Sequence, residues 1–174
     1  MLKPNPIPEL RKRTSGFDFL IGDWSVENRR LRTPLAAADD WYSTPATARA
    51  TTLHNGAISI DEMWFGELGF AGSSVRVHDA AADDWTIYWI NSQTGHLQPP
   101  VRGRWHPDGT FVADGPDTYD GRDIIARYIW HSITPTSAIW EQAFSIDERR
   151  TWETNWIMTW TRIEVTGDLL PRGE

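Results

Sequence analysis

Two side chains in this sequence could exchange protons inside a binding site. Glu62 lies in residues 57–65, where apolar residues share its face, and a carboxylate on such a face must be paired, hydrogen-bonded or protonated. His96 lies in the loop 94–100, and an imidazole changes its charge near neutral pH, which suits acid/base catalysis. Each residue also has a structural explanation, Glu62 as a charge on the outer face and His96 as a solvated loop residue.

Other catalytic patterns are missing from the sequence. It contains no cysteine, so thiolate chemistry and disulfides are excluded. No histidine stands at a metal-ligand spacing such as His-x-x-x-His or His-x-Glu, and there is neither a glycine-rich phosphate loop nor a Gly-x-Ser-x-Gly motif. We therefore expect no metal ion and no cofactor.

Alternating residues indicate which side chains would line an interior. In residues 151–163 the face of Trp156 is large and almost uncharged, as a ligand cavity wall should be, and in residues 85–92 we expect the tryptophan face to point inward. A few polar residues on these inward faces would orient the ligand. The expected ligand-binding residues are Asn28, Glu62, Trp89, Asn91, Gln142, Trp156, Met158 and Trp160.

The pattern leaves the inward face of two segments open, residues 57–65 and residues 122–131. If Glu62 and Arg127 both point inward, they could form a buried ion pair. If the expected faces are inverted, the site would instead have to be sought among Arg29, Arg127, Glu141 and Asn155.

The elements that must position these residues are short strands. From Phe17 onward, segments of period two alternate with turn signals, of which His106-Pro107-Asp108-Gly109-Thr110 is the clearest. This pattern predicts an all-β protein, a single antiparallel up-and-down β-barrel of about 8–10 strands. The expected strands are 23–33, 45–53, 57–65, 72–78, 85–92, 101–106, 109–113, 122–131, 137–145 and 151–163. Residues 1–16 would form an N-terminal arm, residues 17–165 the barrel and residues 166–174 a polar tail.

The start of the barrel carries a recognisable motif. Phe17-x-Phe19-Leu20-x-Gly22-x-Trp24 resembles the opening of the calycin superfamily, which includes the lipocalins, and is most similar to bacterial lipocalin-like domains of unknown function related to nitrobindin. The resemblance implies that Trp24 packs at the closed end of the barrel beneath Arg162 from the last strand. Nitrobindin-like proteins bind haem through a histidine near the C-terminus. This chain has no histidine after His131, so we expect no haem.

A second motif predicts a hairpin. The sequence Ser145-Ile146-Asp147-Glu148-Arg149-Arg150-Thr151-Trp152 resembles the Asp-box of sialidases and other β-proteins, Ser-x-Asp-x-Gly-x-Thr-Trp, with Arg149 in the place of the glycine. The Ser and Asp side chains of such a box bind amides of the turn, and the motif supports folding rather than catalysis. An arginine at a position that favours positive φ predicts a distorted version.

Composition limits the class of protein. The 174 residues suffice for one domain with a real core, and the 11 tryptophans indicate an aromatic interior. A net charge of −7 argues against nucleic acid as a partner. No stretch is apolar enough for a signal peptide or a membrane helix, so we expect a cytoplasmic protein without a membrane partner.

Three functions fit these observations. The first is a barrel that binds a small hydrophobic or aromatic metabolite in a tryptophan-lined cavity. The second is a cofactor-free enzyme, an isomerase, cyclase or lyase, with Glu62 or His96 as the acid/base. The third is an interaction module, such as a homodimer, in which outward Tyr128 and Trp130 form the interface.

Overall fold

A computed structural model describes residues 16–163, which fold into ten strands and two short 3₁₀ helices. The polar tail and almost all of the N-terminal arm that the sequence predicts lie outside the described residues. None of the helical segments in the described part is long and apolar enough to cross a membrane. The elements are η1 (Asp18–Leu20), β1 (Gly22–Leu31), β2 (Trp41–Leu53), β3 (Ile58–Phe65), η2 (Gly66–Leu68), β4 (Phe70–Asp79), β5 (Asp84–Asn91), β6 (Val101–Trp105), β7 (Phe111–Tyr119), β8 (Arg122–His131), β9 (Ser137–Ser145) and β10 (Glu153–Arg162).

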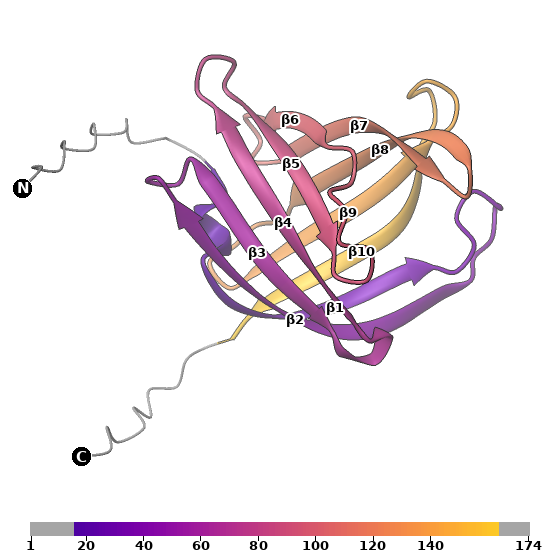
Figure 1. Cartoon of the computed structure of the whole chain (residues 1–174), viewed down its shortest axis with the longest axis horizontal. Coiled ribbons are helices and arrows are strands. Elements are labelled where there is room, and N and C mark those ends of the chain that lie inside the picture. Colours follow the sequence, from indigo (N-terminus) through magenta and orange to yellow (C-terminus); the bar gives the residue numbers. More distant parts are fainter. Residues whose placement is uncertain (1–15, 164–174) are drawn as a thin grey trace, which may run out of the picture.

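Each strand pairs antiparallel with the next one along the chain, and β1 also pairs with β10 (Figure 1). The sheet is therefore a closed up-and-down barrel, which confirms the predicted fold class. Because β1 is hydrogen-bonded to β2 on one side and to β10 on the other, the first and last strands have no free edge where they meet.

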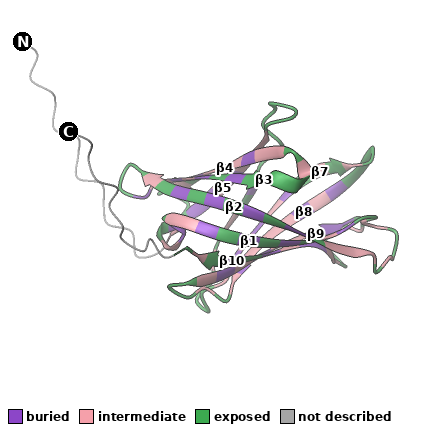
Figure 2. Cartoon of the chain, turned by 90° about the horizontal axis from the view of Figure 1, so that it is seen from below, coloured by how far each residue is buried: buried purple, intermediate pink, exposed green. Residues whose placement is uncertain are grey.

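The alternation that predicted the strands also sorts the side chains between core and solvent. In β1, Trp24, Val26 and Asn28 are buried, whereas Ser25 and Glu27 are exposed. Figure 2 shows buried and exposed residues alternating along β1 and β2. The inward face of β1 is therefore the one that the sequence predicts.

One strand is longer than its sequence suggests. The segment 109–113 was expected to end before Gly115-Pro116, but β7 continues to Tyr119. The first half of β7 pairs with both β6 and β8, whereas the half beyond Asp114 pairs with β8 alone. Proline is tolerated on such an edge. A Cβ on Gly115 would lie 2.3 Å from the carbonyl oxygen of Pro100, so a glycine lets the preceding loop pass close to β7.

One end of the barrel is closed by the expected tryptophan and arginine. The guanidinium carbon of Arg162 lies 4.3 Å from the ring centroid of Trp24, and its three nitrogens donate to backbone carbonyls. The indole N–H of Trp24 donates to the carbonyl of Leu20, 2.7 Å away. These bonds fasten η1 across the end of the barrel, so the contact implied by the lipocalin-like motif is present.

The Asp-box hairpin between β9 and β10 has the expected hydrogen bonds. Asp147 accepts from the backbone N–H of Arg150 and Thr151 and from the hydroxyl of Thr151, and the hydroxyl of Ser145 accepts from the amide of Arg149. Arg149 has a φ of +72°. Arg149 thus adopts the positive φ of the glycine that it replaces, the expected bonds form without a visible distortion, and the motif serves the turn.

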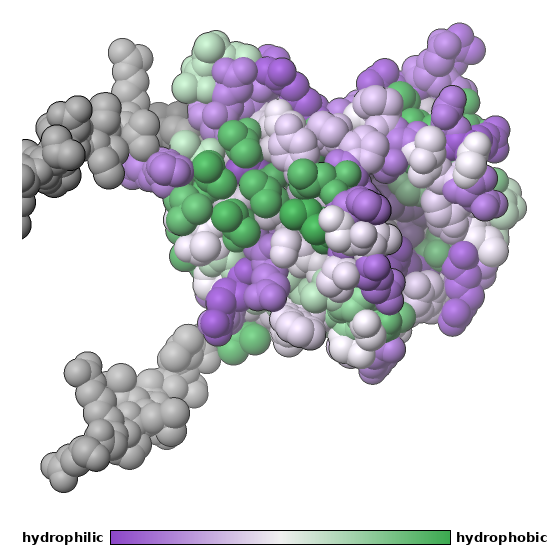
Figure 3. All heavy atoms as spheres, viewed as in Figure 1, coloured by the Kyte–Doolittle hydropathy of each residue, from purple (hydrophilic) through white to green (hydrophobic). Residues whose placement is uncertain are grey.

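The outer wall formed by β3, β4 and β5 is unusually apolar. Figure 3 shows hydrophobic surface gathered over this part of the barrel. Val77 at 38% exposure and Leu53 at 45% lie on this side of the barrel. The outward apolar residues of the three strands are Ile58, Ile60, Trp64, Val75, Val77, Tyr88 and Ile90.

Candidate functional site

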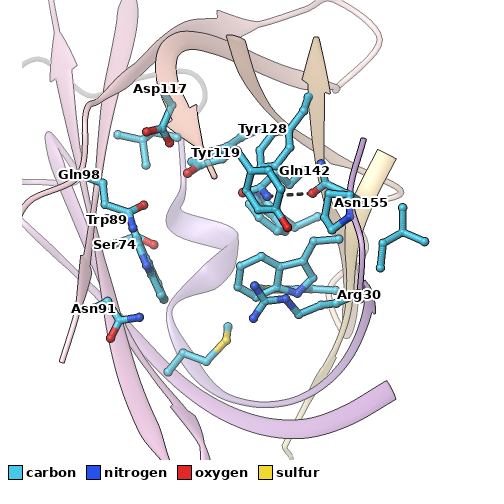
Figure 4. Close-up of a pocket in the computed structure, with 18 of the residues that line it drawn as sticks. Arg30, Ser74, Trp89, Asn91, Gln98, Asp117, Tyr119, Tyr128, Gln142 and Asn155 are labelled. Carbon is cyan, nitrogen blue, oxygen red and sulfur yellow. Dashed lines mark hydrogen bonds between the residues drawn. The ribbon is translucent and has the colours of Figure 1, made fainter. Parts of the chain in front are cut away.

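The barrel encloses a cavity of about 350 Å³. It is lined by inward side chains from the strands and, at the end opposite η1, by residues of the connecting loops such as Pro34 and Gln98. Figure 4 shows Trp89 and Asn91 on one wall, facing Gln142, Asn155 and Arg30 on the other. The cavity therefore runs from a floor near the closed end to a mouth among the loops.

Aromatic rings in contact with one another form much of the wall. The rings of Trp140 and Trp156 meet edge to face with centroids 5.3 Å apart, and Trp130 and Trp160 are 5.2 Å apart. Such contacts between aromatic rings favour fixed relative orientations. All four line the cavity, together with Trp89.

The floor, the part of the cavity nearest the closed end, contains a buried ion pair that the sequence pattern did not predict. Arg76 on β4 donates through Nη2 to a carboxylate oxygen of Asp61 on β3, and the two side chains are only 3% and 2% exposed. The other oxygen of Asp61 accepts from the backbone N–H of Ser74 at 3.3 Å. Both charges are thus balanced inside the barrel, where an isolated charge would be costly.

A second arginine lies nearer the mouth. The guanidinium carbon of Arg30 is 3.9 Å from the ring centroid of Trp156, a cation–π contact. Burial lowers the pKa of Arg30, because desolvation disfavours its charged form, and Tyr42 and Tyr119 partly oppose this shift. Among residues 16–163, no ion pair joins Arg30 to a carboxylate. It therefore offers a positive charge beside an aromatic wall.

Tyr128 adds a neutral hydroxyl to the same cavity. Burial raises the pKa of its phenol far above the usual range, and the nearby negative charge of Asp117 raises it further. The phenol stays protonated at physiological pH and can both donate and accept a hydrogen bond. Figure 4 shows Asp117 near the tyrosines of this wall.

Six of the eight expected ligand-binding residues line the cavity. The side chain of Gln142 is already used in part, since its amide donates to Asn155 at 2.9 Å (Figure 4). The six residues are Trp89, Asn91, Gln142, Trp156, Met158 and Trp160.

Asn28 is buried as expected but does not line the cavity. Its amide donates to the carbonyl of Thr44 at 3.2 Å, and its oxygen accepts from the indole N–H of Trp156 at 3.0 Å. Both polar atoms of the Asn28 side chain thus have a partner within the protein, and the expected water or ligand beside it stays a prediction. Its role in the structure is to hold Trp156 in place.

Glu62, expected among the ligand-binding residues, does not line the cavity. It is exposed on the outer wall, because the inward positions of β3 belong to Ser59, Asp61, Met63 and Phe65. The misleading signal is Trp64, a large aromatic residue that is 58% exposed on the outside. Asp61 takes the inner position because Arg76 neutralises it.

The expected pair between Glu62 and Arg127 is also absent. Arg127 faces outward, donates to both carboxylate oxygens of Asp114 at 2.7 and 2.8 Å, and stacks on Trp152. Because the opposite face of β8 points inward, Tyr128 and Trp130 lie inside the barrel. The predicted interface through these two residues is therefore wrong.

His96 lies exposed in the loop between β5 and β6 and does not line the cavity. Gln98 of the same loop does, and its backbone N–H donates to the carbonyl of Trp89 at 2.9 Å. Together with the outward position of Glu62, this removes both expected acid/base groups from the site.

Asn155 faces the cavity although alternation places it on the outer wall. The pairing of β10 with β9 shifts between Thr154 and Trp156, so a β-bulge adds one residue at this point. The bulge brings Asn155 to the same side as Trp156. Of the four residues named for inverted faces, Asn155 alone lines the cavity; Arg29, Arg127 and Glu141 do not.

The strand pattern of the sequence could have identified the two cavity arginines, Arg30 and Arg76. Arg30 shares the inward face of Trp24 by simple alternation, and Arg76 lies in the predicted strand 72–78.

Within residues 16–163, no three histidine or acidic side chains gather as a metal site. His131 lies on the outer wall, where it contacts Glu141 and Ser132.

Comparisons with known proteins place the fold but not a family. No protein-family model matches the sequence, and no curated protein matches it either. The structure is similar to an S-type phycobiliprotein lyase from Guillardia theta, with a TM-score of 0.54 and 13% identity over 84% of this chain and 89% of that one. The likeness and the closed ten-strand barrel support a calycin-like fold. The relation to nitrobindin stays a prediction.

Proposed function

We propose that this protein binds one small hydrophobic or aromatic molecule inside its barrel. The observation that supports this most is the cavity of about 350 Å³, walled by Trp89, Trp140 and Trp156 and reaching the loops at one end. Binding pockets for small molecules are typically concave, mostly apolar and furnished with a few polar groups. Flat indole faces favour a planar or cyclic ligand.

The structural neighbour supports ligand handling in such a barrel. It is by name a lyase of phycobiliproteins, but at 13% identity the likeness extends to the fold alone. The enzyme alternative has lost both of its expected acid/base residues. Binding is therefore the better supported function.

A pair of variants on one strand tests the proposal. Ser74 lines the cavity, whereas its neighbour Ser73 faces outward. Ser74→Phe should place a ring inside the cavity, compete for space with tetralin and phenanthrene and weaken their binding about tenfold, while Ser73→Phe should leave their binding unchanged. Circular dichroism would verify that both variants fold, and calorimetry would give the dissociation constants. If neither hydrocarbon binds the wild-type protein, or if both variants bind equally well, the proposal fails.

The other expectations about partners stay predictions. Light scattering at high concentration would test the homodimer, and the apolar outer wall of β3–β5 is the surface to examine in place of Tyr128 and Trp130. The absence of a nucleic-acid partner and of a membrane partner, and the cytoplasmic location, likewise stay predictions.

A further inference from the structure

We propose that the floor of the cavity receives an uncharged carbonyl-type oxygen of the ligand, as in a ketone, quinone or lactone. This inference rests on the proposed function, because it concerns the chemistry of a molecule bound in the same cavity. The inference specifies the orientation of that ligand, with its carbonyl oxygen at the floor of the cavity.

The observation behind it is a group of N–H donors that lack acceptors. Nε and Nη1 of Arg76 and the indole nitrogens of Trp130 and Trp160 are buried and have no hydrogen-bond partner. All three side chains line the cavity, and they are 3%, 1% and 2% exposed. Buried polar groups are almost always bonded in folded proteins, so several orphaned donors in one place require an explanation.

These donors come from different strands and meet at the same end of the cavity. Arg76 extends from β4, and its guanidinium carbon lies 5.8 Å from the ring centroid of Trp130 on β8. The ring of Trp130 is in turn 5.2 Å from that of Trp160 on β10. Three strands therefore bring these three side chains, each with an unsatisfied N–H group, together at one end of the cavity.

Among residues 16–163, no protein acceptor lies within hydrogen-bond distance of these donors, although the hydroxyl of Ser59, which pairs with Arg76 across β3 and β4, is also buried and unpartnered. The nearest carboxylate, Asp61, is committed to Nη2 of Arg76 and to the backbone N–H of Ser74. A tryptophan indole can only donate, and a guanidinium has no acceptor atom. The missing partner must therefore be an acceptor that enters from outside, on a ligand or as water.

The charge of the floor favours a neutral acceptor. Asp61 already balances Arg76, so the floor is electrically neutral. A carboxylate placed here would lie beside the negative Asp61 and would lose its hydration without a cation of its own. A carbonyl oxygen gains hydrogen bonds from the same donors without adding charge.

A matched pair of probes tests this inference. Tetralin and 1-tetralone have the same bicyclic frame, and 1-tetralone carries one ketone oxygen. Trp130→Phe and Trp160→Phe each remove one donor and keep an aromatic ring. The double variant Asp61→Leu/Arg76→Met removes the guanidinium without leaving a buried charge. Trp89→Phe is the matched control, because it removes an indole N–H from the wall rather than from the floor.

We expect the ratio of the two dissociation constants to move about tenfold against 1-tetralone in the double variant, and several-fold in each floor tryptophan variant. Trp89→Phe should weaken both probes alike and leave the ratio unchanged. The infrared carbonyl band of bound 1-tetralone should lie at lower frequency than in an alkane solvent and should shift back in the floor variants.

The remaining outcomes overturn the inference. If 1-tetralone binds with the same ratio in every variant and its carbonyl band does not shift, water satisfies the floor and the inference is wrong while the proposed function stands. If tetralin-2-carboxylate depends on Arg76 more strongly than 1-tetralone does, the floor is an anion site instead. If neither tetralin nor phenanthrene nor 1-tetralone binds, the proposed function has failed and the inference with it.

Discussion

Replacement of Asp61 by asparagine would leave the guanidinium of Arg76 without its counter-charge at the floor of the barrel. The side chains of Asp61 and Arg76 are only 2% and 3% exposed, so bulk water cannot hydrate the guanidinium in place of the lost carboxylate. Asp61 accepts from Nη2 of Arg76, and Nε and Nη1 have no acceptor. Breaking a buried pair from one side typically costs about 3–5 kcal/mol, because it leaves an uncompensated charge. We expect Asp61→Asn to lower the free energy of unfolding by this amount.

Two further variants test whether the loss of stability comes from the unpaired buried charge of Arg76. Asp61→Leu/Arg76→Met replaces both charges by apolar groups and should stay within about 2 kcal/mol of the wild type. Asp23→Asn breaks the pair with Arg49, whose side chain is 77% exposed, and should cost less than about 1 kcal/mol.

Urea unfolding followed by far-UV circular dichroism gives the three free energies, with equal m-values as the sign that the compactness of the unfolded state is unchanged. A loss below about 1 kcal/mol for Asp61→Asn would refute the reasoning. It would mean that the floor is hydrated and that Arg76 does not depend on Asp61.

Three other predictions concern the closure, the strand pairing and the hairpin. Trp24→Ala should cost about 3–5 kcal/mol in urea unfolding as a core truncation, and a loss near zero would contradict the closure by Arg162. Gly103→Ala should destabilise by at least about 1–3 kcal/mol, because its Cβ would lie 1.9 Å from the carbonyl oxygen of Val112. Gly66→Ala, which meets no atom within 4 Å, should have little effect in the same assay. Hydrogen bonds from the side chain and amide of Thr151 lower the pKa of Asp147 to about 2. The stability from this carboxylate is therefore complete above the ordinary aspartate pKa, about 3.9, and is lost as the pH falls toward 2. Carboxyl-carbon NMR should find the midpoint near 2, and a midpoint near 4 would show that these bonds are absent in solution.

The sequence predicts the barrel well because alternation and turn residues are local signals. Ten expected segments correspond to ten strands, and the contact between Trp24 and Arg162 follows from a short motif. The inward faces of β1, β5 and most of β10 follow from the same alternation.

The cavity floor could not be predicted, because it depends on contacts between strands. In β3, alternation allows either face to point inward, and the exposed Trp64 favours the wrong one. The choice is decided by Arg76 on the next strand, which can neutralise Asp61 but cannot reach a residue on the outer wall. Asn155 is a similar case, since a β-bulge appears only when β10 pairs with β9.

The central claim is that a small molecule binds inside the barrel, and the indole N–H signals of the protein test it most directly. Each of the 11 tryptophans gives one signal in a nitrogen–proton NMR spectrum. On addition of tetralin, we expect the signals of Trp89, Trp140 and Trp156 to shift together, while that of Trp64, exposed on the outer wall, does not move. A shift confined to Trp64, or no shift at saturating tetralin, would contradict the account.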